Sequence, residues 1–320
     1  MDADAAQCPM PNLFIVGAPK CGTTSVYEYL RGHHDIYFPH DDNDYARVKE
    51  PNHLCPELDI GAKDAIRDRD AYLALYRGSA GARWRGDAST NYLFSEIAAN
   101  AIRRLSPQAR ILIMLRPPPD WMRSYHSELL RHRHEDIADF HDAVAASEDR
   151  SHGRRIPAST GVPRCLDYLA MARFTPQVQR YYDVFGRDAV KVILLEDLAT
   201  SPARTFRQIL EFLDVDTEYR PRFSVHNETP RHGRTERLLR AGYRHASVRT
   251  AIQHVVPRTA RRRILALVRR AESRHASEDP RDRQLRLQCA ADIGQLSALI
   301  DRDLDHWLNP PARQRPKQRD

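Results

Sequence analysis

The residues with the clearest chemical use lie in segment 12–30, NLFIVGAPKCGTTSVYEYL. The apolar run 13–16 predicts a buried parallel strand, and Gly17 and Gly22 permit a tight turn and a close backbone approach to a ligand. Thr23 opens a short series of hydroxyl residues that is typical of a helix start. A strand, a glycine loop and a helix N-terminus present unpaired N–H groups and the positive end of the helix dipole to an anion. The spacing therefore predicts a phosphate site.

The position of Lys20 sets this loop apart from an ordinary P-loop. In the pattern GxxxxGK[ST] the lysine follows the second glycine, but here Thr23 has that place and Lys20 lies two residues before Gly22. A displaced lysine reaches a different phosphate oxygen. An ordinary strand-to-helix turn is the alternative. The residues predicted to bind a phosphate-bearing nucleotide are Ala18, Pro19, Lys20, Cys21, Gly22, Thr23, Thr24 and Ser25.

Arg116 is a second residue suited to an anion, because it directly follows the apolar run 110–115. An arginine fork forms charge-assisted hydrogen bonds with phosphate, and open α/β sheets bind ligands at the carboxyl ends of their strands. Alone, an arginine after a strand is usually a surface residue. Together with the glycine loop, however, Arg116 predicts a further phosphate contact.

Lys49, Glu50 and His53 lie in the sequence VKEPNHL, where the proline favours an extended backbone at Glu50. Taken alone, such a charged pair with a nearby histidine is typical of an exposed surface segment without a catalytic role. A general base must lie within hydrogen-bond reach of the proton that it removes. A carboxylate serves when burial raises its pKa toward neutrality, so both Glu50 and His53 are chemically able.

Apolar runs at 13–16, 110–115 and 190–195 alternate with helical patterns, which is typical of a parallel sheet. Segment 82–89 is expected to add a short strand that ends at Asp87. We predict Asp120 as a helix cap. Helices are expected at 60–77, 163–186, 202–213, 238–270 and 285–308.

Charge and cysteine content limit the class of protein. The chain has 320 residues and a formal net charge of +7, which suits an anionic substrate, a nucleic acid or an anionic membrane surface. Its five cysteines form no CxxC pair, so we expect no disulfide framework, no zinc ribbon and a reducing cytosol. The acidic N-terminus is not expected to be a signal peptide. The charged segment 135–155 is expected to be mobile, and we predict no metal site, because His33, His34 and His40 lack a completed ligand set.

Several of these segments resemble sulfotransferases that use PAPS (3'-phosphoadenosine 5'-phosphosulfate). GAPKCGTTS is similar to the 5'-phosphosulfate loop of that family, and Arg116 with Ser124 resembles its 3'-phosphate element. The family is also resembled by three further segments, namely STNYLFS, VILLEDL and the end of the last helix. The resemblance covers 13–308 and is to bacterial enzymes and to carbohydrate and heparan sulfate sulfotransferases.

This resemblance implies a fold and roles for further residues. The fold is α/β, a P-loop-like three-layer arrangement with a central parallel sheet flanked by helices. We expect a flexible 1–11, one domain over 12–308 whose part 230–308 is mainly helical, and a disordered basic tail at 309–320. Phe174 stands where the family more often has tyrosine. The implied roles are catalysis by Glu50 with Lys20, His53 as the competing base, acceptor contacts by Lys49, Ser89 and Tyr92, and 3'-phosphate contacts by Arg116, Ser124, Arg231 and Arg234.

The implied reaction moves the sulfuryl group of PAPS to a hydroxyl or amine of a carbohydrate, glycolipid or small natural product and releases the bisphosphate PAP. It requires no metal. One alternative is a P-loop kinase or NTPase with ATP and Mg²⁺, which would carry GK[ST]. Another is a basic nucleic-acid or membrane-surface binder. The basic amphipathic pattern of segment 238–270 is compatible with a peripheral contact with an anionic membrane, and a surface helix of a soluble enzyme is the alternative. Nucleic acid is not expected, because aromatic residues are not interleaved there. We expect a cytoplasmic enzyme; the oligomeric state is open.

Overall fold

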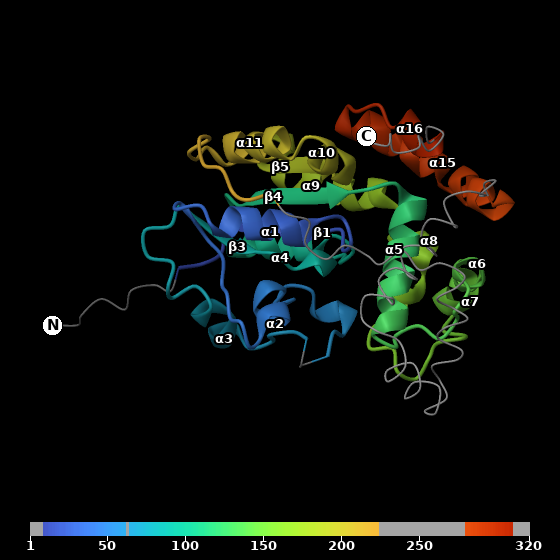
Figure 1. Ribbon diagram of the computed structural model, residues 1–320. Helices are drawn as coiled ribbons and strands as arrows, with labels where there is room; N and C mark the ends of the chain where they lie inside the picture. The colour runs from blue at the N-terminus through green and yellow to red at the C-terminus, as the bar shows by residue number, and fades with distance from the viewer. Residues whose placement is uncertain (1–8, 62–63, 224–278, 310–320) are drawn as a thin grey trace, which may run out of the picture. The chain divides into compact units, whose positions relative to one another are not determined.

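The computed structural model describes residues 9–61, 64–223 and 279–309 (Figure 1). Backbone contacts divide the chain into two units, 1–227 with 285–320 and 228–284. The description below concerns the first unit. Arg231, Arg234, the predicted helix 238–270 and the terminal segments 1–8 and 310–320 lie outside the described residues, so the expectations for them, and that of one domain over 12–308, stay predictions.

A five-stranded parallel sheet in the order β2-β3-β1-β4-β5 forms the centre of this unit. The sheet confirms the α/β prediction and contains all three predicted apolar strands and the short strand that ends at Asp87. The strands are β1 (Leu13–Gly17), β2 (Ile36–Tyr37), β3 (Trp84–Asp87), β4 (Arg110–Leu115) and β5 (Val190–Leu194).

Strand order explains where a ligand site forms. After β1 the chain adds β2 and β3 on one side of it and then β4 and β5 on the other. The order of the strands therefore reverses at β1, and such switch points leave a crevice at the carboxyl ends of a parallel sheet. The glycine loop follows β1, and Arg116 follows the neighbouring β4. Both therefore lie at this edge.

Helices pack on the two faces of the sheet. α1 packs with α11 through Tyr29 and Phe206, whose rings meet edge to face at 5.9 Å, and α4 packs against α9. Because βαβ crossovers are right-handed, these two pairs lie on opposite faces. No helix among the described residues is long and apolar enough to cross a membrane. The helices are α1 (Thr23–Arg31), α2 (Tyr45–Lys49), α3 (Arg69–Ala74), α4 (Ala98–Leu105), α5 (Pro118–Arg131), α6 (Phe140–Ala145), α7 (Ser147–Ser151), α8 (Tyr168–Met171), α9 (Phe174–Phe185), α10 (Leu195–Thr200), α11 (Pro202–Leu213), α15 (Pro280–Ile300) and α16 (Asp305–Leu308).

Four expectations about helices need correction. Asp120 lies in the first turn of α5 and does not cap it, because Pro118 begins the helix after Pro117. Segment 163–186 is not one helix but a 3₁₀ turn, α8 and α9, since Arg173 leaves the helical conformation. In segment 60–77 the helix is α3 alone, and the last helix stops before Asp301, whose φ of 51° is left-handed.

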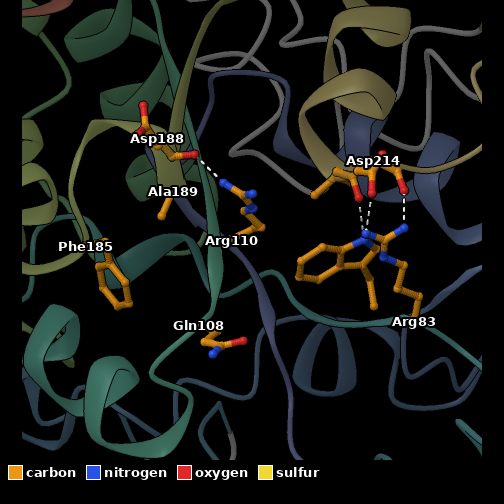
Figure 2. A pocket seen from close by; sticks show the side chains of 9 residues that line it. Arg83, Gln108, Arg110, Phe185, Asp188, Ala189 and Asp214 are labelled. Atoms are coloured by element: carbon orange, nitrogen blue, oxygen red, sulfur yellow. Dashed lines mark hydrogen bonds and ion pairs between the residues drawn. The ribbon is translucent and has the colours of Figure 1, made fainter.

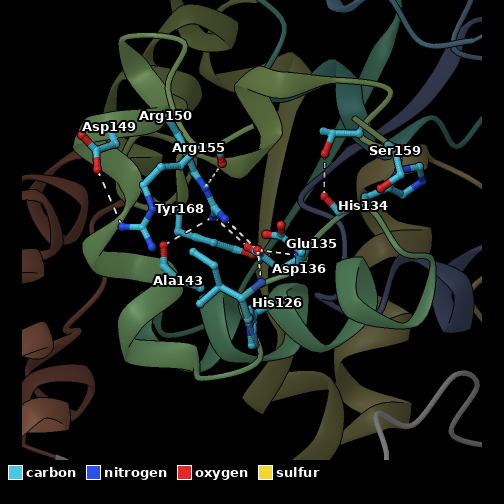
Figure 3. A network of polar contacts seen from close by, with 12 residues as sticks. His126, His134, Glu135, Asp136, Ala143, Asp149, Arg150, Arg155, Ser159 and Tyr168 are labelled. Carbon is cyan, nitrogen blue, oxygen red and sulfur yellow. Dashed lines mark hydrogen bonds and ion pairs between the residues drawn. The ribbon is translucent and has the colours of Figure 1, made fainter. Parts of the chain in front are cut away.

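Segment 135–155 folds into α6 and α7 around a buried ion pair, which corrects the expectation of a mobile segment (Figure 3). Arg150 donates to both oxygens of Glu135, at 2.7 and 2.6 Å, and both side chains are fully buried. The Tyr168 hydroxyl donates to Glu135 at 2.7 Å, and the backbone N–H groups of Asp136 and Ile137 donate to the same carboxylate at 2.8 Å. The pair ties α7 to the loop that follows α5.

Candidate functional site

The glycine loop begins where β1 meets the segment after β3. Gly17 has a φ of 139°, and a Cβ there would lie 2.5 Å from the carbonyl oxygen of Thr90. Only glycine therefore fits between the two segments. Gly22, with a φ of 86°, is the residue before the first turn of α1, and Thr23 begins the helix. The start of the helix thus adjoins the loop, where the positive end of the helix dipole favours an anion.

Neighbouring elements hold the loop from two sides. The Ala18 N–H donates to the carbonyl of Met114 in β4 at 2.7 Å. The indole Nε1 of Trp121, in α5, donates to the Pro19 carbonyl at 2.8 Å. Phe174, fully buried, packs edge to face against Trp121 at 5.8 Å, so this aromatic residue supports the loop through its neighbour. The loop is thus fixed by β4 and α5.

Arg116 follows β4 and lies against the loop. Its Nη1 donates to the Lys20 carbonyl at 3.3 Å. Its Nε is buried, and among the described residues it has no hydrogen-bond partner. A buried guanidinium N–H without a partner is costly and fits an anion that arrives with a ligand. Ser124 is buried on α5, the helix that follows Arg116.

Cys21 contributes its backbone and not its thiol. The side chain is fully buried, and burial raises the pKa of the thiol to about 12. It therefore stays protonated and unreactive at neutral pH. Lys20 extends instead toward α5, where its Nζ forms an ion pair with Glu128 Oε2 at 2.9 Å.

Glu50 lies just after α2, and both of its carboxylate oxygens are held. Oε1 accepts from Lys49 Nζ at 2.6 Å, and Oε2 accepts from Thr90 Oγ1 at 2.7 Å. Lys49 is almost fully buried and lies 5.7 Å from the Tyr27 ring centroid, whereas the Glu50 side chain is 29% exposed. The carboxylate is thus fixed on its protein side and open on the other, which suits a group that receives a proton from a ligand.

Ser89 and Tyr92 lie in the core and bond to Asp87. The Ser89 hydroxyl donates to Asp87 Oδ1 at 2.7 Å, and the hydroxyls of Tyr92 and Tyr72 donate to Oδ2 at 3.0 and 2.8 Å. Burial raises the pKa of Asp87, and these hydrogen bonds oppose the shift. The two predicted residues therefore brace the end of β3, and their contact with an acceptor stays a prediction.

His53, the competing base, is oriented by the core. Its Nδ1 lies 2.8 Å from the Ile66 carbonyl oxygen, and its ring stacks on Tyr72 with centroids 4.2 Å apart. In the neutral tautomer that donates to this carbonyl, Nε2 is the nitrogen left to accept a proton. Its role as a base stays a prediction.

Thr90 and Glu128 are site residues that sequence analysis missed. Thr90 stands between Ser89 and Tyr92, and its position just beyond a parallel strand was the available signal. Glu128 lies four residues after Ser124, so both lie on the same side of α5.

One group of described residues has metal-ligand proximity, namely His33, His34 and Asp35. Both ring nitrogens of His33 already lie 3.1 Å from backbone atoms, the Asp216 carbonyl oxygen and the Asp35 nitrogen. The group therefore offers no free nitrogen on its buried histidine.

A cavity of about 510 Å³ lies away from the glycine loop, among residues at the amino ends of the strands (Figure 2). Arg83 forms an ion pair with Asp214 at 2.6 Å, and Arg110 donates to the Asp188 carbonyl. Both arginines are thus engaged by the protein. The cavity lies at the opposite edge of the sheet from the predicted site.

Comparisons with known proteins agree with this geometry. The model of the sulfotransferase family matches residues 11–219. A crystal structure of a sulfotransferase from Alicyclobacillus acidocaldarius is 30% identical, with a TM-score of 0.66 over 93% of this chain and 99% of that one.

Curated relatives show a more distant similarity. Carbohydrate sulfotransferase 15 from Homo sapiens is 23% identical, over 64% of this chain and 44% of its own length. Bifunctional heparan sulfate N-deacetylase/N-sulfotransferase 1 from Mus musculus is 24% identical, over 64% of this chain and 22% of its own length. The chain therefore spans less than half the length of these relatives. The family match and the similarity to the bacterial structure show that the chain belongs to the sulfotransferase family.

Proposed function

We propose that this protein transfers a sulfuryl group from PAPS to a hydroxyl or amine of a carbohydrate and releases PAP. The observation that carries the proposal is the contact of Thr90 with both Gly17 and Glu50, because it joins an anion-binding loop to a fixed carboxylate. The names of the relatives, carbohydrate and heparan sulfate sulfotransferases, support a saccharide acceptor.

The donor-binding residues are those of the loop and the end of β4. PAPS, when bound, supplies the activated sulfuryl group. The backbone N–H groups before α1 and the positive end of its dipole favour a phosphate at the loop. The unpartnered Nε of Arg116 offers a charge-assisted hydrogen bond to a second anionic group, and Ser124 is the proposed hydroxyl beside it.

In this proposal Glu50 removes the proton of the acceptor's hydroxyl or amine. A hydroxyl or amine becomes a better nucleophile as a positioned carboxylate removes its proton. Thr90 and Lys49 fix the orientation of this carboxylate, so little reorganisation is needed. Lys20 supplies a positive charge next to the loop, which stabilises negative charge that develops on a transferred group.

A thermal-shift titration with PAP, compared with ADP and with ATP plus Mg²⁺, tests the donor. A ligand that binds only the folded state raises stability with the logarithm of its concentration over Kd. We expect PAP to raise the Tm and ADP, which lacks the 3'-phosphate, to raise it much less. A shift with ATP plus Mg²⁺ alone would replace the proposal by a kinase or NTPase.

Thr90 is expected to control turnover and not donor binding. Thr90→Val removes the hydroxyl that donates to Glu50 but keeps the side-chain shape, so kcat should fall about tenfold, the effect of one lost hydrogen bond to a charged group.

The matched control for this variant is Thr90→Ser, which keeps the hydroxyl and should retain most of the turnover. PAP release with a panel of hydroxyl- and amine-bearing saccharides gives kcat, and calorimetry gives the PAP affinity. Equal kcat values for the Val and Ser variants would remove Thr90 from the reaction.

A further inference from the structure

Glu128 brings a negative charge into a site that is built for anions. It lies on α5, and its Oε2 accepts from Lys20 Nζ at 2.9 Å. The same oxygen accepts from Arg131, one turn later on the helix, and Oε1 lies 3.3 Å from His132 Nε2. This carboxylate thus contacts one cation from the loop and two groups from its own helix.

The ion pair is partly shielded from water and is charged at neutral pH. The side chains of Lys20 and Glu128 are 13% and 26% exposed. Burial acts to raise the pKa of Glu128, but the hydrogen bonds and charges of Lys20 and Arg131 outweigh it and hold that pKa below its usual range. The carboxylate is therefore ionised whenever a donor binds.

The position of this carboxylate has a physical reason. Arg116 donates to the backbone carbonyl of Lys20, so the loop residue that carries the ammonium is held against a second cationic residue. Like charges in a partly buried site disfavour each other. A carboxylate that binds Lys20 lowers this cost in the free protein and keeps the lysine directed to α5.

We propose that Glu128 is the internal counter-ion of Lys20 and that a phosphate of the donor replaces Glu128 as the partner of Lys20 when the donor binds. This inference rests on the proposed function of the loop. Glu128 keeps Arg131 and His132 as partners when Lys20 leaves, so the exchange does not leave the Glu128 carboxylate without a partner. Because the free state is favoured by the ion pair, the donor binds less tightly than the loop alone would allow. Glu128 thereby sets the affinity for the donor.

Calorimetric titration with PAP tests the proposal without an acceptor. Glu128→Gln keeps the shape and loses the charge, and we expect its Kd for PAP to be about three- to tenfold lower than that of the wild type, the range of a partly exposed ion pair. The matched control is Asp214→Asn, which breaks the ion pair with Arg83 at the opposite edge of the sheet and changes the net charge equally. This control should leave the Kd unchanged.

A double-mutant cycle shows whether Glu128 acts through Lys20. In the Lys20→Met background, Glu128→Gln should give no gain in PAP affinity, because there is no ammonium to release. An equal gain in both backgrounds would mean plain repulsion between Glu128 and the ligand and would overturn the proposal. An unchanged or weaker affinity of the single variant would overturn it as well.

The same titration separates this inference from the function beneath it. A wild-type protein that binds no PAP removes the proposed donor and the role of Glu128 together. A wild-type protein that binds PAP, beside a Glu128→Gln variant that gains nothing, removes the role of Glu128 alone. Melting curves of each variant without ligand show whether the fold is intact.

Discussion

Glu50→Gln is expected to lower turnover by about 100- to 10,000-fold, the range that general-base catalysis contributes. The amide keeps the size of the side chain, and its oxygen still accepts one of the two hydrogen bonds that Lys49 and Thr90 donate. It cannot receive a proton from an acceptor. PAP release with saccharide acceptors measures the loss.

Donor affinity supplies the control for this prediction. The carboxylate of Glu50 forms its hydrogen bonds with Lys49 and Thr90, which lie outside the loop 18–22, so the Kd for PAP should stay within about threefold of the wild type, a change of less than about 1 kcal/mol. His53→Gln is the matched comparison for the competing base. Near-normal turnover of Glu50→Gln together with a large loss in His53→Gln would transfer the role to His53.

Arg150→Met is expected to lower the free energy of unfolding by about 3–5 kcal/mol, the cost of breaking a buried ion pair by removal of one partner. The loss arises because Glu135 would remain fully buried with its charge uncompensated. Urea denaturation measures it. Arg154→Gln is the matched control, since Arg154 pairs with Asp149 at the surface, where ion pairs contribute little to stability, and we expect a much smaller loss. A loss of similar size in both variants would contradict the role of burial.

The same ion pair predicts a direction for the pH dependence of stability. Burial acts to raise the pKa of Glu135, but hydrogen bonds from Arg150, the backbone and Tyr168 hold that pKa below its ordinary value of 4.5. A carboxyl with a lowered folded-state pKa stabilises the fold above the unfolded-state value, and this contribution is lost as the pH falls through the folded-state value. The wild type should therefore lose more stability below about pH 4.5 than Arg150→Met does.

The strands and the loop were predictable because their signals are local. Each of the apolar runs of β1, β4 and β5 is continuous in the sequence, and the two glycines of the loop, Gly17 and Gly22, lie five residues apart. The partner of Glu50 is Thr90, 40 residues away, and the partner of Lys20 is Glu128, 108 residues away. No local pattern carries such contacts, since they depend on which strands become neighbours in the sheet.

Other differences arose where one physical preference outweighed another. The predicted contact of Ser89 and Tyr92 with an acceptor stays a prediction, and the sequence did not indicate that their hydroxyl groups donate to the buried carboxylate of Asp87. High charge in segment 135–155 suggested exposure, yet Glu135 and Arg150 satisfy each other inside the fold. A charged residue read singly favours the surface, whereas a geometrically matched pair does not.

The close approach of Gly17 to Thr90 couples the position of the glycine loop to that of the Glu50 carboxylate. A side chain at position 17 would press on the carbonyl of Thr90 before it touched any donor group. Since Thr90 also donates to Glu50, displacement at the start of the loop would be transmitted to this carboxylate. Tolerance to substitution at Gly17 is therefore governed by the segment after β3 as well as by the loop itself.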